Sequence, residues 1–181
     1  MRNKKFTTKR IVIDALFAAI YILLSYLAIP VGNTLKISLE SLPVVIGALM
    51  FGPLDGVLIA IVGTFIYQLT GPYGITPTLP LWMLPYILEG VTVGEFAKRH
   101  HLRNTKKEIM LISIVGELIV FAFNTLAIFI DSKMYGYYTP VSVWGMAGIR
   151  LLIAVAKAVA YGFILPPILN ALAKVTGRRK N

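Results

Sequence analysis

The chain has 181 residues, 57% of them hydrophobic, and a formal net charge of +10 at pH 7. Such an apolar composition excludes an ordinary soluble domain, and the absence of cysteine excludes disulfides and thiolate metal sites. The basic residues border apolar stretches and form no stripe on one face, so contact with anionic lipid headgroups explains the charge better than nucleic-acid binding does.

Apolar stretches fill almost the whole chain. A helix rises about 1.5 Å per residue, so roughly 17–25 apolar residues cross the hydrocarbon core of a bilayer. The second and third stretches are shorter, and only residues 52–55 separate them, which predicts a tight helical hairpin. We therefore predict an all-α integral membrane bundle of six transmembrane helices in a single membrane domain over residues 1–181, with spans at roughly 11–30, 35–52, 56–71, 77–97, 109–130 and 141–173.

The distribution of Lys and Arg predicts the orientation of this bundle. Most basic residues lie in segment 2–10, in the 98–107 loop and in the tail from residue 174 onward. Six spans place these three regions on one side of the membrane, whereas the connections on the other side hold only Lys36 and Lys133. Positively charged loops stay in the cytoplasm during insertion, so both termini are expected to be cytoplasmic.

The first span carries a stripe of small side chains. Ala15 and Ala19 are one helical turn apart, and Ala18 lies beside them. Helices in lipid approach one another closely through small side chains. The stripe therefore predicts either packing inside the bundle or a docking face for another membrane protein. Asp14 and Glu95, near the cytoplasmic edge, are expected to make packing or partner contacts.

Prolines mark the fourth span. It follows a turn at residues 71–74, and it carries Pro77 and Pro80 at its start and Pro85 in its interior. Each proline removes a backbone donor, and free backbone groups at membrane depth are tolerated only against protein or a wet cavity. The pattern predicts either a broken helix beside a cavity that opens to the outside, or a kinked packing helix.

Polar and aromatic residues inside the spans predict a pocket that opens to the outside. Trp82, Tyr86 and Glu89 share one face of the fourth span. Aromatic walls suit an apolar or heterocyclic body, and a few polar groups fix its orientation. Arg150, nearer the outer side, is expected to meet a ligand carboxylate or carbonyl. The candidate substrate-binding residues are Trp82, Tyr86, Glu89, Asn124, Trp144, Arg150, Gln68, Tyr73 and Tyr26.

Polar and aromatic residues inside the spans also have structural interpretations. Glu117 and Lys157 are expected near the middle of the bilayer as a buried ion pair, because an ionisable group in hydrocarbon needs a partner or a water-filled site. This pair would form the floor of the pocket or serve packing alone. Trp82 and Trp144 would otherwise belong to the interfacial aromatic belt.

Sequence motifs of catalysis are missing. The chain contains no G-x-x-x-x-G-K-[ST], no H-E-x-x-H and no G-x-S-x-G. The histidines, His100 and His101, lie in a basic loop and are expected to be solvated. Glu89 and Glu117 alone do not make a metal site. We therefore predict neither an enzyme nor a bound metal or cofactor.

Three segments resemble a known family. Segment 36–43 reads Lys-Ile-Ser-Leu-Glu-Ser-Leu-Pro, segment 47–56 ends in a Phe-Gly-Pro-x-x-Gly hairpin, and segment 81–86 reads Leu-Trp-Met-Leu-Pro-Tyr. With the six-span pattern, they resemble the folate-type branch of the substrate-binding S components of energy-coupling-factor (ECF) vitamin transporters. The resemblance covers essentially the whole chain.

The resemblance implies a component that binds a small B vitamin from outside with high affinity in the bacterial plasma membrane. Its partners would be a transmembrane T component and two cytosolic ATPases, which hydrolyse the ATP. The family's docking face for the T component corresponds to Ala15, Ala18 and Ala19. The loops that gate the site would contain Gly32, Asn33, Gly71 and Gly74.

The predicted vitamin depends on two features of the sequence, a departure from the pattern of folate S components and the position of Arg150. Folate S components carry an arginine after a Leu-Ser near the outer end of the first helix, whereas this chain has Tyr26 after Leu24 and Ser25. A folate glutamate tail would lose that partner. Pantothenate, with one carboxylate, suits Arg150, and folate, pyridoxine and hydroxymethylpyrimidine are alternatives.

Two other functions stay open. A stand-alone transporter coupled to protons or sodium would use an intramembrane acid, for which Glu89 and Glu117 are candidates. A non-transporting membrane scaffold is the second. Neither requires ATPase partners, so co-purification with ATPases separates both from the S-component interpretation.

Overall fold

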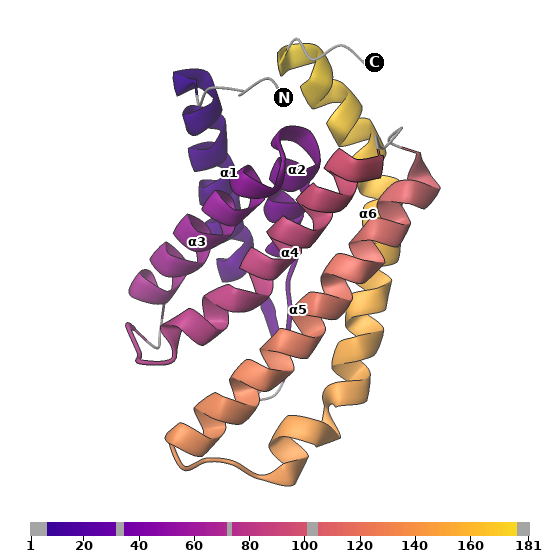
Figure 1. The fold of residues 1–181 in the computed structure, drawn as a ribbon. Coiled ribbons are helices and arrows are strands. Elements are labelled where there is room, and N and C mark those ends of the chain that lie inside the picture. The colour runs from indigo at the N-terminus through magenta and orange to yellow at the C-terminus, as the bar shows by residue number, and fades with distance from the viewer. Residues whose placement is uncertain (1–6, 32–34, 72–73, 101–104, 177–181) are drawn as a thin grey trace.

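The computed structural model describes residues 7–31, 35–71, 74–100 and 105–176, which form a helical bundle (Figure 1). A short π-helix, η1 (Val141–Gly145), and two strands, β1 (Ile29–Val31) and β2 (Leu35–Ile37), accompany the α-helices. The predicted all-α membrane bundle is confirmed, with a small hairpin added. Within these ranges the six helices are α1 (Thr8–Tyr26), α2 (Ser41–Phe51), α3 (Pro53–Thr70), α4 (Leu79–His100), α5 (Lys106–Met134) and α6 (Ala147–Thr176).

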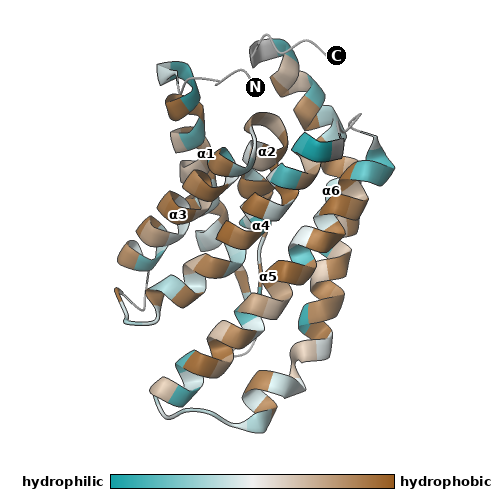
Figure 2. Cartoon of the chain, in the orientation of Figure 1, coloured by the Kyte–Doolittle hydropathy of each residue, from teal (hydrophilic) through white to brown (hydrophobic). Residues whose placement is uncertain are grey.

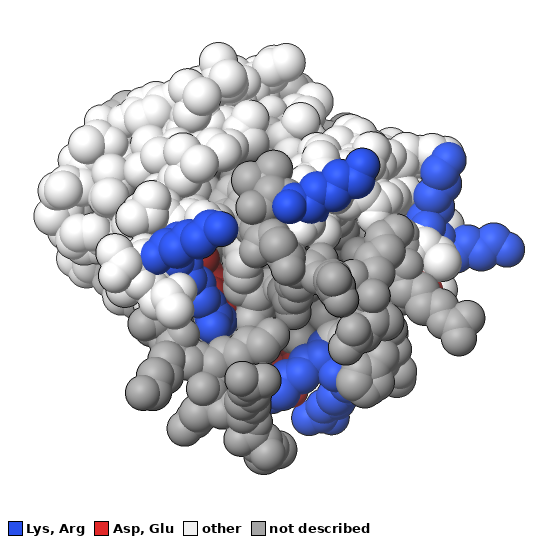
Figure 3. All heavy atoms as spheres, turned by 90° about the horizontal axis from the view of Figure 1, so that it is seen from above, with Lys and Arg blue, Asp and Glu red and all other residues white. Residues whose placement is uncertain are grey.

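The two ends of the bundle differ in charge. The start of α1, the end of α4, the start of α5 and the end of α6 all lie at one end (Figure 1). Viewed from that end, Lys and Arg side chains stand out from the described surface (Figure 3). By the positive-inside rule this end is the cytoplasmic one, and η1 lies toward the outside.

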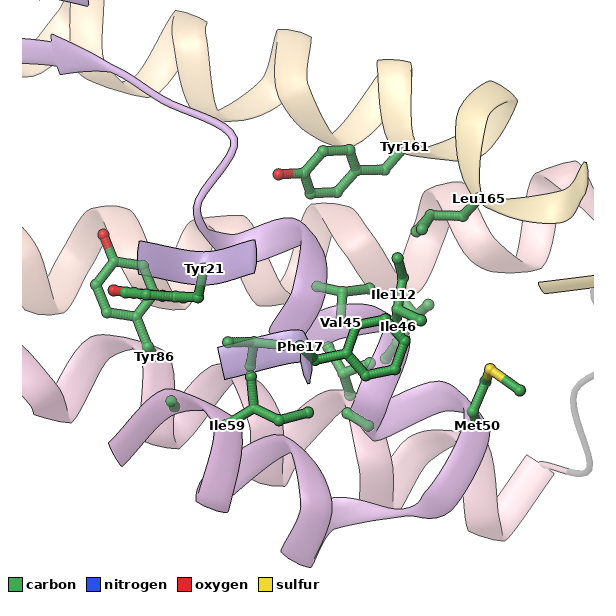
Figure 4. Close-up of a cluster of buried hydrophobic side chains, with 14 of the residues drawn as sticks. Phe17, Tyr21, Val45, Ile46, Met50, Ile59, Tyr86, Ile112, Tyr161 and Leu165 are labelled. Atoms are coloured by element: carbon green, nitrogen blue, oxygen red, sulfur yellow. The ribbon is translucent and has the colours of Figure 1, made fainter. Parts of the chain in front are cut away.

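Hydrophobic residues make up most of the length of the helices (Figure 2). Among the described helices, α3, α5 and the stretch Val141–Lys174 are long and apolar enough to span a membrane by themselves. The short α2 has 11 residues and lies in the centre of the bundle, where Val44, Val45 and Ala48 are fully buried. Side chains from α1, α3, α5 and α6 pack around it in one apolar core (Figure 4).

The second span begins later than predicted. Residues 35–37 were expected to start it, but they pair with β1 in an antiparallel hairpin, with Ile29 opposite Ile37 and Val31 opposite Leu35. Branched apolar residues at alternate positions favour extended backbone. The helix begins at Ser41, and Pro43 lies in its first turn, where a missing backbone donor is tolerated.

Glycines bring α2, α3 and α4 close together. Gly52 separates α2 from α3 with a φ of 117°, a conformation that favours glycine, and Pro53 begins α3. A Cβ atom on Gly94 of α4 would lie 2.4 Å from the Cα of Pro53. The predicted tight hairpin is therefore present, and it packs directly against α4.

Helix α4 is continuous despite its prolines. It runs from Leu79 to His100 with Pro85 inside it, so the broken helix considered from the sequence is not observed. Pro80 lies in the first turn, where the backbone donor has no helical partner. The polar face of α4 is consequently carried by an uninterrupted helix.

Candidate functional site

A buried polar cluster lies where α2 begins, inside the otherwise apolar bundle. Glu40, the residue before α2, is only 1% exposed. The Nζ atom of Lys36 on β2 lies 2.7 Å from one Glu40 carboxylate oxygen. The Tyr86 hydroxyl donates a hydrogen bond to the other. Glu40 thus connects the β1–β2 hairpin to α4.

Ser41, the first residue of α2, connects the cluster to α5 and α6. Its hydroxyl donates to the Glu117 carboxylate over 2.7 Å and lies 2.8 Å from the Tyr161 hydroxyl. The Nζ atom of Lys157 lies 2.9 Å from the other Glu117 oxygen. The structure therefore brings Glu117 and Lys157 together as an ion pair. A buried pair needs such added hydrogen bonds, because desolvation otherwise cancels much of the attraction.

Glu89 on α4 lies beside this ion pair and is fully buried. Glu117, Lys157 and Glu40 all act on its carboxyl group electrostatically. In the part of the chain that the structure describes, neither Glu89 oxygen makes a hydrogen bond. Gly116 of α5 makes room for it, since a Cβ atom there would lie 3.3 Å from Glu89 Oε1. A buried polar group without a partner is rare and needs an explanation.

Tyr21 extends the cluster to α1. Its ring is 1% exposed and meets the Tyr86 ring edge-on, with the centroids 5.4 Å apart (Figure 4). Its hydroxyl accepts a hydrogen bond of 3.0 Å from Thr64 on α3. Gly63 leaves the space for the ring, because a Cβ atom there would lie 2.7 Å from it. Residues of α1, α3 and α4 therefore meet beside Glu40.

Three predicted residues lie on the outer side of this cluster. Asn124 of α5 interacts with the Tyr86 hydroxyl, and Trp82 is half-buried one turn before Tyr86 on α4. Arg150 is 8% exposed and donates to the backbone carbonyl of Val143 in η1. Its Nε and Nη1 atoms have no hydrogen-bond partner among the described residues.

A second group of predicted residues lies on α1 and α3 near the β1–β2 hairpin. The Tyr26 hydroxyl donates to the Thr70 hydroxyl over 2.8 Å, and its ring packs edge-on against Tyr67 at 5.3 Å. The Lys36 ammonium lies 4.9 Å from the centre of the Tyr67 ring. Gln68 is half-buried next to Tyr67. Tyr26, Tyr67 and Gln68 form an outer patch, and Lys36, which also pairs with Glu40, links this patch to the buried cluster.

The predicted gating loops are described in part. Gly71 ends α3 with extended backbone, and Gly74 has a φ of 66°, which favours glycine. Gly32, Asn33 and Tyr73 lie outside the described residues.

Trp144 lies in a different place from the polar cluster. It lines an apolar groove of about 460 Å³ between α5 and the start of α6, together with Phe129 and Ala147. More than half of its side chain is exposed. The hydroxyl of Thr125 in this groove already donates to the Phe121 carbonyl. The groove therefore suits lipid chains, and the belt position considered for Trp144 agrees with its exposure.

The alanine stripe of α1 is split between two environments. Ala15 and Ala19 are exposed, whereas Ala18 is 3% exposed and packs inside the bundle. Docking of a partner at Ala18 stays a prediction, and in this structure its methyl group does not reach the surface. Exposed apolar side chains flank the other two, among them Val12, Leu16 and Leu23.

At the cytoplasmic end, Arg10 ties α1 to the α2–α3 hairpin. Its guanidinium donates to the Asp55 carboxylate and, over 3.0 Å, to the Phe51 carbonyl. The hydrogen bond to Asp55 raises the pKa of Arg10. Asp14 is buried nearby, which agrees with the packing contact expected for it.

Sequence reasoning did not include Glu40, Ser41 or Tyr21 among the site residues. Glu40 is an acidic residue inside a predicted span. Burying an ionisable group in hydrocarbon costs free energy, so its position was a signal that could have identified it as a site residue. Ser41 and Tyr21 carry no such signal, because neutral polar side chains are common in helices. The packing of the short α2 against its neighbours is what places them in the cluster.

Comparison with known proteins agrees with this architecture. The family model described as "ECF transporter, substrate-specific component" matches residues 9–175. A UPF0397 protein of Streptococcus pneumoniae (strain Hungary19A-6) is 27% identical over 172 residues, which cover 84% of this chain and 92% of the relative.

Solved structures share the fold. The S component for biotin from an ECF-type ABC transporter is 16% identical, with a TM-score of 0.68 and coverage of 94% of each chain. FolT bound with folic acid is 21% identical, with a TM-score of 0.70 over 91% of this chain and 95% of its own. ThiT from Listeria monocytogenes is 20% identical, with a TM-score of 0.70 over 92% of this chain and 98% of its own. The family match covers nearly the whole chain, and the chain belongs to the substrate-specific components of ECF transporters, which are membrane-embedded transport proteins and not enzymes.

Proposed function

We propose that this chain is the high-affinity vitamin-binding S component of an ATP-driven importer in a bacterial plasma membrane. The observation that carries the proposal is Glu89, a fully buried carboxyl group without a hydrogen-bond partner among the described residues. Within a family of substrate-specific components, such a group is best explained as a ligand contact. Tyr86, Asn124, Trp82 and Arg150, which lie on the outer side of Glu89, are the other proposed contacts.

The proposed substrate is a small B vitamin, with pantothenate favoured. Arg150 is a buried cation near the outer end of α6, and two of its nitrogen atoms have no hydrogen-bond partner in the described part of the chain, which suits one carboxylate. Tyr26, which stands where a folate S component would carry an arginine, is uncharged and donates to Thr70. Folate, pyridoxine and hydroxymethylpyrimidine are the alternatives that the test below includes.

The test is identification of the ligand on the detergent-purified protein. The protein is denatured, its small molecules are extracted and they are identified by mass spectrometry. We expect one vitamin in a stoichiometric amount. The hit is then titrated by tryptophan fluorescence in a Trp144→Phe variant, in which Trp82 is the remaining tryptophan. An empty extract, together with no response to any of the four vitamins, would contradict the proposal.

A T component and two ATP-binding subunits are the proposed partners. The exposed Ala15 and Ala19, with their apolar neighbours on α1, are the proposed docking surface. Small side chains permit the close helix approach that association in lipid requires.

Replacing Ala19 with Leu is therefore expected to reduce vitamin uptake by cells at least tenfold while leaving the affinity of the isolated protein unchanged. Transport assays and binding titrations measure the two quantities. The matched control is Ala156→Leu on α6, which is also an exposed alanine and lies on a different helix. Loss of binding in the Ala19 variant would mean that this position serves internal packing.

A second candidate function rests on the same buried acids. A stand-alone transporter coupled to protons or sodium would use Glu89 or Glu117 as its coupling group. It would transport without ATPases. Purification from cells that express the partner subunits separates the two, because only the S-component function predicts a stable complex with ATP-binding proteins. A scaffold without transport would bind no vitamin.

A further inference from the structure

Two buried side chains, Glu89 and Arg150, keep hydrogen-bonding atoms without a partner among the described residues. Neither carboxylate oxygen of Glu89 has a partner in the described part of the chain. Arg150 uses Nη2 on the Val143 carbonyl, but its Nε and Nη1 have no partner there either. The two residues are fully buried and 8% exposed, respectively. Buried polar groups are normally hydrogen-bonded, so both sites call for a complementary group.

The other charged groups of the cluster are already satisfied. Glu40 is held by Lys36 and the Tyr86 hydroxyl. Glu117 is held by Lys157 and Ser41. One oxygen of Glu117 makes no hydrogen bond, but it faces the Lys157 ammonium at 2.9 Å, whereas both oxygens of Glu89 lack a hydrogen-bond partner among the described residues.

Helix α6 relates the two sites to each other. Arg150, Ala154, Lys157 and Tyr161 share one face of this helix, and Lys157 reaches the ion pair beside Glu89. Arg150 is seven residues nearer the outside, which corresponds to about 10 Å along the helix axis. Ala154, the buried residue between them on this face, has a small side chain.

We propose that the ligand binds lengthwise along this face, with a carboxylate on Arg150 at the outer side and an O–H or N–H donor on Glu89 deeper in the bundle. A guanidinium binds a carboxylate through two parallel hydrogen bonds, and the carboxyl oxygens of Glu89 can accept hydrogen bonds from a donor. The substrate class is therefore a small monocarboxylate that carries hydrogen-bond donors at its opposite end. This inference rests on the proposed function and assigns the orientation of its ligand.

The test compares pantothenate with pantothenol, in which the carboxylate is replaced by an alcohol. Dissociation constants are measured on the purified full-length protein for the wild type, Arg150→Gln and Glu89→Gln. The wild type is expected to bind pantothenate at least tenfold more tightly than pantothenol. Arg150→Gln is expected to abolish this preference by weakening pantothenate alone. Glu89→Gln is expected to weaken both ligands by a similar factor, because both keep the donor end.

Two further variants control for folding and for general charge. Arg150→Lys keeps the positive charge without the two-pronged geometry, so it is expected to retain part of the preference. Lys133→Gln removes an exposed cation at the outer end of α5 and is expected to change neither affinity. Retained pantothenol binding by Arg150→Gln shows that this variant is folded.

The outcomes separate this inference from the proposed function. If a vitamin binds the wild type but Arg150→Gln weakens pantothenate and pantothenol equally, the orientation is wrong while the vitamin-binding function stands. A stoichiometric uncharged ligand, pyridoxine or hydroxymethylpyrimidine, would overturn the orientation in the same way. If folate is the ligand, Arg150→Gln must weaken folate. If no vitamin binds the wild type, both proposals fail.

Discussion

Replacing Lys157 with Met is expected to lower the free energy of unfolding by about 3–5 kcal/mol. The substitution removes the ammonium 2.9 Å from Glu117 and leaves a carboxylate that is 1% exposed without its counter-charge. The lost attraction is only part of the cost, because an unpaired charge in the bundle has also lost its hydration. Reversible unfolding in mixed detergent micelles measures the change.

A second variant shows whether the unpaired charge causes the loss. Adding Glu117→Gln to Lys157→Met removes the charge, so the double variant is expected to be more stable than Lys157→Met alone. Lys98→Met is the matched control. Its ammonium lies 3.3 Å from Glu95 on the exposed surface, where an ion pair contributes at most about 1 kcal/mol. Equal losses in Lys157→Met and Lys98→Met would contradict the buried-pair account.

The second large effect is expected at the contact between α4 and the α2–α3 hairpin. In Gly94→Ala the new Cβ atom would lie 2.4 Å from the Cα and N atoms of Pro53, which are backbone atoms and cannot rotate away. Overpacking of this kind costs about 1–3 kcal/mol. We expect a lower melting temperature in detergent, and a loss of stability that the helix propensity of alanine does not offset.

Gly148→Ala on α6 is the matched control for that substitution. A Cβ atom at position 148 would meet no atom within 4 Å, so the same change is expected to be neutral or slightly stabilising. Equal melting temperatures for Gly94→Ala and Gly148→Ala would mean that α4 lies farther from the α2–α3 hairpin than in this structure.

Several features of the fold follow from local sequence. The apolar stretches predicted the bundle, because the free energy of transfer from water to lipid is a sum over the residues of each span. The positions of Lys and Arg predicted its orientation, because positively charged loops stay in the cytoplasm. The Gly52-Pro53 turn was also predictable, since these two residues have strong local backbone preferences. The face shared by Tyr86 and Glu89 follows from helical periodicity alone.

The site was less predictable, because its members come from helices that are distant in sequence. Glu40 and Ser41 are neighbours, yet one bonds to Tyr86 on α4 and the other to Glu117 on α5. Trp144 shows the reverse case, since a tryptophan at the right depth lies in a groove away from the cluster. Depth in the membrane can be read from sequence position, but the direction of a side chain around the helix axis depends on which helix lies beside it.

The six-helix membrane bundle and its basic cytoplasmic edges therefore follow from local sequence, because the free energy of transfer into lipid and the cytoplasmic retention of positive charge depend on the residues of each segment. Tertiary packing set features that the sequence did not predict: Ala18 is buried, residues 35–37 pair with residues 29–31, and Glu89 lies beside the Glu117–Lys157 ion pair with neither of its oxygens hydrogen-bonded to another described residue. Those outcomes depend on the packing of α2 between its neighbours, and packing is a property of the whole set of helices.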